Sequence, residues 1–259
     1  MLLAIDIGNS NIVWGLFRQQ ELIGSWRMET ALSQTAEAYG DSLSRQLDTA
    51  RQSIAAITDT IICSVVPILT PVFERVTQDL LQHRPLVVSS CMDTGLVVRY
   101  ADPRTLGADR LVNAVAAYDR HKTNIIVIDL GTATTFSVVT QKGEFLGGAI
   151  APGLGISAEA LSAKTAQLPK AFLAPPQSVI GRDTLANIQS GLIYGHAAMV
   201  DELTARLQEE LGQEAMAVAT GGFSSIIALY CKRIHEVRPH LTLEGLELLY
   251  RRHKGESQA

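Results

Sequence analysis

Two short segments of the chain repeat one arrangement of a carboxylate, a glycine and a polar side chain. Residues 6–10 are Asp-Ile-Gly-Asn-Ser, and residues 129–132 are Asp-Leu-Gly-Thr. Each follows an apolar run, which predicts a strand, a tight turn and a second strand. Glycine lets the backbone approach a ligand closely, and the flanking polar groups can bind a cation or a phosphate. Two such hairpins that face each other predict a site for the phosphates of a nucleotide.

The alternative for either segment alone is an ordinary β-turn on the surface. The pair favours the nucleotide site, because two copies in the same context are harder to explain as chance. The P-loop pattern is absent, and Gly153-Leu154-Gly155 lacks the third glycine of a dinucleotide fingerprint. If the protein binds a nucleotide, the duplicated hairpin must therefore do so.

A third candidate segment is Gly-Ala-Asp-Arg at residues 107–110, at the start of a predicted helix. One interpretation is structural, since an acidic residue in the first turn of a helix favours the helix dipole. The other makes Asp109 a general base for phosphoryl transfer and Arg110 a clamp for an anion. The glycine-rich residues 147–153 and 219–223 likewise predict either tight turns or ligand contacts.

The predicted elements occur in the same order twice. In the first half we expect strands near 2–8, 12–18 and 22–29, a helix at 35–47, a strand at 60–66, a helix at 69–82 and a strand at 86–88. In the second half we expect strands near 124–129, 133–140 and 143–150, helices at 153–163 and 184–211, a strand at 215–219, a helix from Ser224 and a last helix at 243–253. This repeat predicts two domains, residues 1–116 and 117–255.

Composition excludes several classes of protein. Hydrophobic residues at 47% and charged residues at 19% indicate a compact soluble protein. A net charge of -4 argues against nucleic acid as a partner. The first apolar run is interrupted by Asp6, and no run approaches the roughly 20 residues of a membrane span, so we expect neither a signal peptide nor a membrane protein. Three cysteines (Cys63, Cys91, Cys231) without a C-x-x-C pattern predict a cytoplasmic protein without disulfides, with Cys63 in the core.

Five motifs, in this order and at these separations, resemble those of the type III pantothenate kinases, within the actin, hexokinase and Hsp70-like superfamily. They are Asp-x-Gly-Asn-Ser, Gly-Ala-Asp-Arg, Asp-x-Gly-Thr-Ala-Thr, Gly-Gly-x-Ile-x-Pro-Gly and Thr-Gly-Gly, and they extend from Asp6 to about Gly222. The resemblance implies an α/β fold of two duplicated ribonuclease-H-like (actin-like ATPase) domains with a central cleft. It also implies ATP-dependent phosphorylation of the terminal hydroxyl of pantothenate to 4'-phosphopantothenate, the first step of coenzyme A biosynthesis.

The resemblance also implies partners and residue roles. The enzyme would be a homodimer that uses ATP with Mg²⁺ and a monovalent cation, K⁺ or NH₄⁺, held by Asp129. Asp109 would be the catalytic base. The residues implied for ATP are Asp6, Ile7, Gly8, Asn9, Ser10, Asn11, Ile12, Val13 and Thr132. Those implied for pantothenate are Tyr100, Gly107, Ala108, Asp109, Arg110 and, from the partner subunit, Thr184. Asp183 stands where the family commonly has asparagine, which adds a negative charge beside Thr184.

The charges of such a site require cations. Two like charges about 4 Å apart repel by roughly 4 kcal/mol at an effective dielectric constant near 20. Asp6, Asp109 and Asp129 beside ATP would therefore need Mg²⁺ and the monovalent ion. Two alternatives stay open, another small-molecule kinase of the superfamily and a non-catalytic nucleotide-binding regulator. Tyr100 and residues 107–110 are the segment that separates the first alternative from a pantothenate kinase.

Overall fold

The computed structural model describes residues 1–89, 92–164, 169 and 173–255, and Cys91 lies outside them. The described chain forms two compact units. Unit 1 comprises residues 1–95, 102–116 and the chain from Thr242 onward, and unit 2 comprises Leu96–Ala101 and Ala117–Leu241. The division into domains at residue 116 stays a prediction, and these units differ from it in two segments, residues 96–101 and the C-terminal helix.

Unit 1 is built on a five-stranded sheet with the order β3-β2-β1-β4-β5. The strands are β1 (Leu2–Ile7), β2 (Asn11–Arg18), β3 (Glu21–Glu29), β4 (Asp59–Ser64) and β5 (Leu86–Val87). The first three strands are antiparallel neighbours, whereas β4 runs parallel to β1 and β5 parallel to β4. The C-terminal ends of β1 and β4 therefore lie side by side, which places Asp6 beside Cys63.

The two faces of this sheet pack against different helices. Alternate residues of β1, Leu3, Ile5 and Ile7, join a core with Tyr39 and Phe73, which belong to α1 (Ala36–Thr49) and α2 (Thr70–Val76). A Cβ atom on Gly15 of β2 would meet the side chain of Leu243, which belongs to α7 (Leu241–His253). Because side chains alternate along a strand, α7 covers the face opposite to α1 and α2.

Unit 2 repeats the topology of unit 1. Its sheet has the order β11-β10-β7-β8-β9-β6. The strands are β6 (Val97–Val98), β7 (Ile125–Leu130), β8 (Ala133–Val139), β9 (Glu144–Pro152), β10 (Met216–Thr220) and β11 (Glu236–Val237). From β9 to β11 the order and the parallel or antiparallel pairing match those from β3 to β5. The duplicated fold predicted from the sequence is confirmed, with β6 added at one edge.

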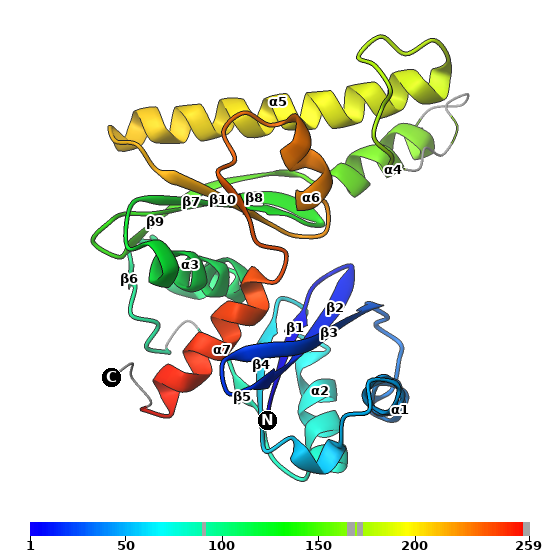
Figure 1. Ribbon diagram of the computed structural model, residues 1–259, viewed down its shortest axis with the longest axis vertical. Helices are drawn as coiled ribbons and strands as arrows, with labels where there is room; N and C mark the ends of the chain where they lie inside the picture. The colour runs from blue at the N-terminus through cyan, green and yellow to red at the C-terminus, as the bar shows by residue number, and fades with distance from the viewer. Residues whose placement is uncertain (90–91, 165–168, 170–172, 256–259) are drawn as a thin grey trace. The chain divides into compact units, whose positions relative to one another are not determined.

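The helices of unit 2 include a very long one. They are α4 (Leu154–Lys164), α5 (Thr184–Leu211) and α6 (Ser224–Ile227), while α3 (Ala108–His121) begins in unit 1 and ends in unit 2. The Asp183 side chain caps α5 by accepting a hydrogen bond from the Ala186 N–H at 2.8 Å. Buried Ile193 and Val200 of α5 pack in one core with Phe136 of the sheet, and Figure 1 shows α5 along one face of β7, β8 and β10.

Some predicted boundaries were wrong. The helix expected at 69–82 ends as an α-helix at Val76 and continues as a π-helical turn (η2, Thr77–Leu81), where the Thr77 hydroxyl donates to the Glu74 carbonyl at 2.8 Å. The strand expected to reach residue 66 ends at Ser64, whose hydroxyl bonds to the backbone of Val66 and turns the chain.

Short helical turns complete the chain. The helix expected from Ser224 is only α6, followed by a 3₁₀ turn (η4, Ala228–Tyr230). Two further 3₁₀ turns are η1 (Ile54–Ala56) and η3 (Pro103–Thr105). No helix in the described part of the chain combines the length and the apolar character that crossing a membrane requires.

Candidate functional site

The first predicted hairpin is the β1–β2 turn of unit 1. The Gly8 N–H donates to the Asn11 carbonyl at 3.0 Å, and the Thr30 hydroxyl donates to the Gly8 carbonyl at 2.7 Å. Of the residues from Asp6 to Val13, Ile7 and Ile12 are fully buried, whereas Asn9 and Ser10 are exposed. The apolar members thus anchor the turn in the core, and Asn9 and Ser10 lie at its surface.

The carboxylate of Asp109 lies against the first turn of α3. Its Oδ1 accepts a hydrogen bond from the Arg110 backbone N–H at 2.7 Å, and it lies 2.6 Å from the place that a Cβ atom on Gly107 would occupy. Burial raises the pKa of Asp109 above its ordinary value, although the backbone N–H and the positive charge of Arg110 oppose this. Arg110 itself is only 7% exposed.

Cys63 connects these two segments within unit 1. It pairs with Asp6 in the register of β1 and β4, and it is completely buried, as the sequence predicts. Burial raises the pKa of its thiol, and the negative charges of Asp6 and then Asp109 raise it further. Asp6 and Asp109 therefore both lie close to one neutral thiol. The sequence motifs do not predict this neighbourhood, and its one signal in the sequence is that parallel strands end at the same edge.

The second predicted hairpin is the β7–β8 turn of unit 2. The Gly131 N–H donates to the Ala133 carbonyl at 3.1 Å, two residues on, whereas the Gly8 N–H in unit 1 donates to the Asn11 carbonyl, three residues on. Asp129 is the last residue but one of β7, and Thr132 lies in the turn. In both hairpins the glycine N–H closes the turn, but the second turn is one residue shorter than the first.

Glycines lie beside the Asp129 carboxylate and beside the turn that follows it. A Cβ atom on Gly221 would lie 2.4 Å from Asp129 Oδ1 and 2.7 Å from the Leu130 carbonyl carbon, and the φ angle there is +90°. A Cβ atom on Gly153 would lie 2.1 Å from the Thr132 carbonyl oxygen and 2.6 Å from that of Gly131. Side chains are thus kept away from one carboxylate and two backbone carbonyls. The sequence alone is compatible with either ordinary turns or ligand contacts at these glycines.

Oxygen donors of this kind suit a hard cation. In the described ranges no group of three or more His, Cys, Asp or Glu side chains could hold a metal ion.

Two further predicted residues lie elsewhere in unit 2. The half-buried Tyr100 ring meets Phe145 edge-on, with centroids 6.3 Å apart, and lies beside Gly147. Thr184 is the first residue of α5 and is exposed. The structure thus groups Asp6, Cys63 and Asp109 in unit 1, and Asp129 with its glycines in unit 2. Thr184 belongs to neither group. Asp183 has a structural role, because it caps the N-terminus of α5.

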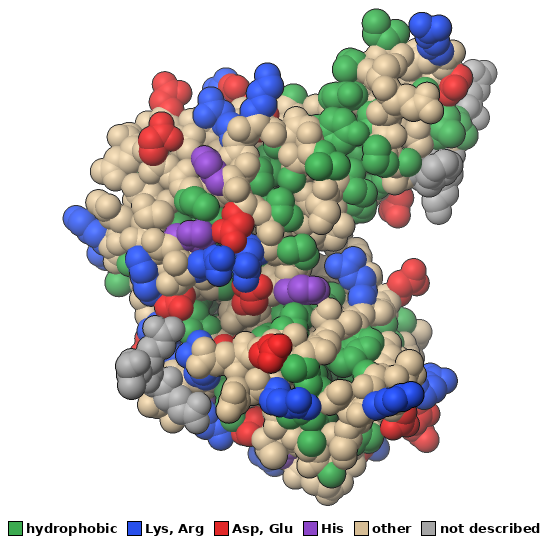
Figure 2. All heavy atoms as spheres, viewed as in Figure 1, with side chains coloured by type: hydrophobic (Ala, Val, Ile, Leu, Met, Phe, Trp, Pro, Cys, Tyr) green, Lys and Arg blue, Asp and Glu red, His purple; other side chains and the backbone are tan. Residues whose placement is uncertain are grey.

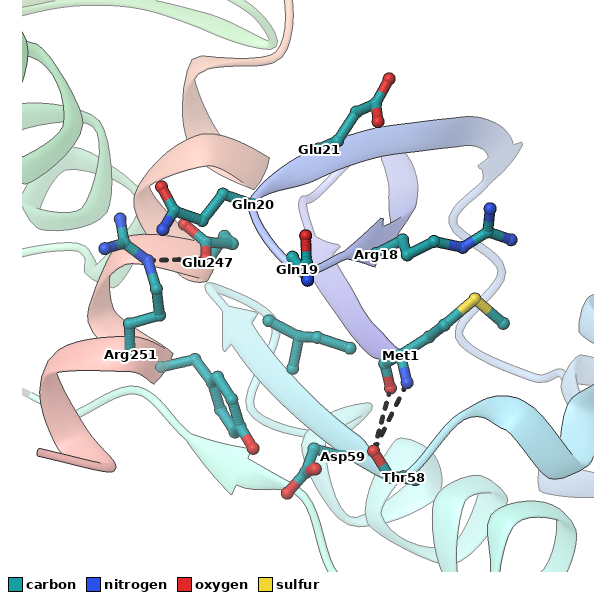
Figure 3. A pocket seen from close by; sticks show the side chains of 11 residues that line it. Met1, Arg18, Gln19, Gln20, Glu21, Thr58, Asp59, Glu247 and Arg251 are labelled. Atoms are coloured by element: carbon teal, nitrogen blue, oxygen red, sulfur yellow. Dashed lines mark hydrogen bonds and ion pairs between the residues drawn. The ribbon is translucent and has the colours of Figure 1, made fainter. Parts of the chain in front are cut away.

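A cavity of about 660 Å³ in unit 1 is separate from all the predicted residues (Figure 3). It lies at the opposite end of β1 from Asp6, between the β2–β3 turn and α7. Three of its charged groups bond within the protein. Arg251 donates to Glu247 at 2.7 Å, and Asp59 pairs with Lys254 at 3.1 Å.

Comparisons with known proteins agree with the motifs. A family model described as type III pantothenate kinase matches residues 2–206. The type III pantothenate kinase of Myxococcus xanthus is 46% identical over 253 residues, covering 97% of this chain and 98% of that protein. That of Geobacter sulfurreducens is 44% identical over 254 residues, covering 98% of this chain and 100% of that protein.

Solved structures of low sequence identity show the fold alone. Component A of (R)-2-hydroxyglutaryl-CoA dehydratase from Acidaminococcus fermentans has a TM-score of 0.56 at 14% identity, covering 99% of both chains. ROK hexokinase from Thermus thermophilus has a TM-score of 0.51 at 15% identity, covering 98% of this chain and 99% of that chain. The units therefore have the duplicated ribonuclease-H-like fold of the actin-like and hexokinase-like ATPases.

Proposed function

This chain belongs to the type III pantothenate kinase family, and on that premise we propose that it transfers the γ-phosphoryl group of ATP to the terminal hydroxyl of pantothenate. The product is 4'-phosphopantothenate, the first intermediate of coenzyme A biosynthesis. The observation that carries the proposal is 46% identity to a protein of that name over 97% of this chain. The carboxylates and hairpins described above supply groups that suit this chemistry.

The two turns suit the phosphates of ATP. We assign the segment from Asp6 to Val13 to these phosphates in unit 1, with the exposed Asn9 and Ser10 as its polar groups. In unit 2 we assign Thr132, in the equivalent turn. Both turns have backbone N–H groups and small or polar side chains, which are the usual donors to phosphate.

Asp109 is the proposed base. A carboxylate whose pKa is raised by burial accepts a proton more readily than an ordinary one, provided that it stays ionised at the working pH. In phosphoryl transfer such a group accepts the proton of the substrate hydroxyl. We assign Tyr100 and the segment of Gly107, Ala108 and Arg110 to the rest of pantothenate, whose carboxylate suits the planar fork of an arginine.

Asp129 is the proposed ligand of a monovalent cation, K⁺ or NH₄⁺. The fit comes from the carboxylate and the carbonyls of Gly131 and Thr132, from which Gly153 and Gly221 keep side chains away. When bound, this ion and the Mg²⁺ that accompanies ATP supply positive charge that offsets the repulsion among phosphates and carboxylates. The residues of the chain itself hold the substrates and accept the proton.

A homodimer is part of the proposal. Large apolar side chains are exposed on α4 and on the segment before α5, among them Ile156 (45%), Val179 (63%) and Ile180 (79%), and Figure 2 shows hydrophobic side chains gathered over α4 and the adjoining part of α5. A surface of this kind favours a protein partner. Thr184 lies four residues after Ile180, so we place Thr184 beside a partner subunit that binds this apolar surface. Light scattering should give a dimer mass that falls to a monomer mass in Ile180→Asp.

The remaining assignments follow from composition. We place the reaction in the cytoplasm, because the cysteines form no C-x-x-C pattern and Cys63 and Cys231 are free. Neither nucleic acid nor a membrane is a proposed partner, since the net charge is -4.

The deciding experiment is a coupled assay of ADP release, with and without pantothenate, in sodium and in potassium buffers. The proposal expects ADP release that depends on pantothenate and on potassium or ammonium. Another kinase of this fold would release ADP only with a different acceptor from a substrate panel. A regulator would show slow hydrolysis that pantothenate does not change.

The base is tested by Asp109→Asn, which should lower kcat at least 100-fold, within the range of about 10²–10⁴ expected of a general base. Asn keeps an acceptor for the Arg110 N–H, so the variant should melt no lower than the wild type. Asp79→Asn is the matched control, because Asp79 is exposed and paired with Arg75 on the surface of unit 1. Retention of most of the rate by Asp109→Asn would show that another group is the base.

A further inference from the structure

The position of the Asp109 carboxylate follows that of the first turn of α3. Its contacts are local, since Oδ1 accepts from the Arg110 N–H at 2.7 Å and lies over Gly107. A side chain held in this way moves with the backbone that holds it. Whatever fixes this part of α3 within unit 1 therefore fixes Asp109.

Helix α7 meets α3 one turn after Asp109. A Cβ atom on Gly245 would lie 2.4 Å from the Val112 carbonyl oxygen and 2.7 Å from Val112 Cγ1. The two helices therefore approach to backbone contact, which only glycine allows at this position. The apolar stripe of α7, including Leu246 and Leu249, is completely buried in unit 1. Helix α7 is thus a fixed support for this turn of α3 (Figure 1).

A hydrogen bond between side chains completes this contact. The Thr242 hydroxyl donates to Asn113 Oδ1 at 2.8 Å, and Asn113 is only 1% exposed. Asn113 lies four residues after Asp109, so the two side chains occupy the same face of α3. Apolar packing lets helices slide, whereas a hydrogen bond from half-buried Thr242 to buried Asn113 is directional and sets the register of α7 against α3.

We propose that Thr242 is a positioning residue for Asp109, acting through its hydrogen bond to Asn113. The proposal rests on the proposed function, because it takes Asp109 as the base of the reaction. It assigns a task to the C-terminal helix, which lies beyond the residues 2–206 matched by the family model. Without the hydroxyl, α3 is free to shift along α7, and the carboxylate loses its alignment with the substrate hydroxyl.

The test compares variants that separate the hydroxyl from the packing of the side chain. Thr242→Val keeps the shape and removes the donor, whereas Thr242→Ser keeps the donor and removes a methyl group. A displacement of about 1 Å can cost roughly 100-fold in rate, so for a smaller shift we expect kcat to fall about tenfold in Thr242→Val. The KM values for ATP and pantothenate should stay unchanged, and Thr242→Ser should keep at least half of kcat.

The pH profile is a second readout that a purely structural role would not move. A loosened first turn exposes Asp109 to water, which lowers a pKa that burial had raised. The acid limb of kcat should therefore move to lower pH in Thr242→Val and stay in place in Thr242→Ser. Thr77→Val is the matched control, because Thr77 also lies in unit 1, is fully buried, and donates a bond of the same length, 2.8 Å, to the Glu74 carbonyl. It should lose stability without a change in kcat.

The opposite order of effects overturns the proposal. If Thr242 only fills space, Thr242→Ser loses activity or stability while Thr242→Val does not. Should Thr242→Val fail to fold, Thr242→Ala against Thr242→Ser still isolates the hydroxyl, and equal kcat in these two refutes the positioning role. Asp109→Asn is measured alongside. If it is inactive while Thr242→Val is unimpaired, only this inference fails; if it is active, the proposed base itself is wrong.

Discussion

At Gly221 in unit 2, a single methyl group should disturb the carboxylate of the proposed cation site directly. The substitution Gly221→Ala adds a Cβ atom 2.4 Å from Asp129 Oδ1 and 2.7–2.8 Å from the backbone of Leu130. The backbone there has a φ of +90°, a conformation that alanine adopts only with strain. Both effects act on the carboxylate that is proposed to hold potassium.

The magnitude follows from these two contributions. A non-glycine residue in left-handed backbone costs about 1–2 kcal/mol, and an extra methyl group in a packed site costs roughly 1–3 kcal/mol. The variant should therefore lose about 2–5 kcal/mol, which lowers Tm by roughly 4–20 °C at 2–4 °C per kcal/mol. A carboxylate displaced by this methyl group should also bind the cation at least about tenfold more weakly, which corresponds to roughly 1.4 kcal/mol.

The assay measures Tm by calorimetry and ADP release against potassium concentration. Gly40→Ala is the control, because Gly40 lies in α1 with open space around its Cβ position, and alanine there should stabilise the helix by about 0.5–1 kcal/mol. A Gly221→Ala variant with the Tm and the potassium response of the wild type would refute the reasoning. Lost stability with an unchanged potassium response would refute only the role of Asp129.

Three further predictions concern titratable groups. Because burial raises the pKa of Asp109 and a base must be ionised, kcat should rise with pH through a pKa above about 4, and an acid limb at an ordinary carboxyl pKa would contradict this. Burial lowers the pKa of His196, so below about pH 6.5 the unfolded chain binds more protons and the free energy of unfolding should fall on acidification; urea titrations at pH 7.5 and 5.5 should show a smaller fall in His196→Gln. Burial raises the pKa of Cys63, so mass spectrometry should find it alkylated by iodoacetamide only after denaturation.

Local sequence predicted most elements because their signals are local. Helix α5 has the predicted bounds, 184–211, with Asp183 as its N-terminal cap and Gly212 in left-handed conformation after its end. Both hairpins lie where the repeated Asp-x-Gly segments predicted them. Elements without such signals were predicted less well. The π-helical turn after Val76 and the short α6 each interrupt an apolar pattern that continues in the sequence.

The neighbours of the candidate site could not be predicted in this way. The Thr242–Asn113 bond joins residues 129 positions apart, and Cys63 meets Asp6 only because β4 pairs with β1. A pattern of apolar residues shows that α7 has a buried face, but it does not show which sheet that face covers. Nothing in the order of the motifs predicted that Leu96–Ala101, including Tyr100, belongs with unit 2.

The sequence by itself determined the chemistry that the chain offers, namely two Asp-Gly hairpins, an Asp-Arg pair at the start of a helix, and the family to which they belong. The tertiary structure decided what surrounds each carboxylate, since Asp109 lies near a buried thiol and on a turn supported by α7, whereas Asp129 lies among glycines. The reason is physical. Backbone propensity and side-chain period act over a few residues, whereas burial and the resulting pKa values depend on packing among segments far apart in the chain.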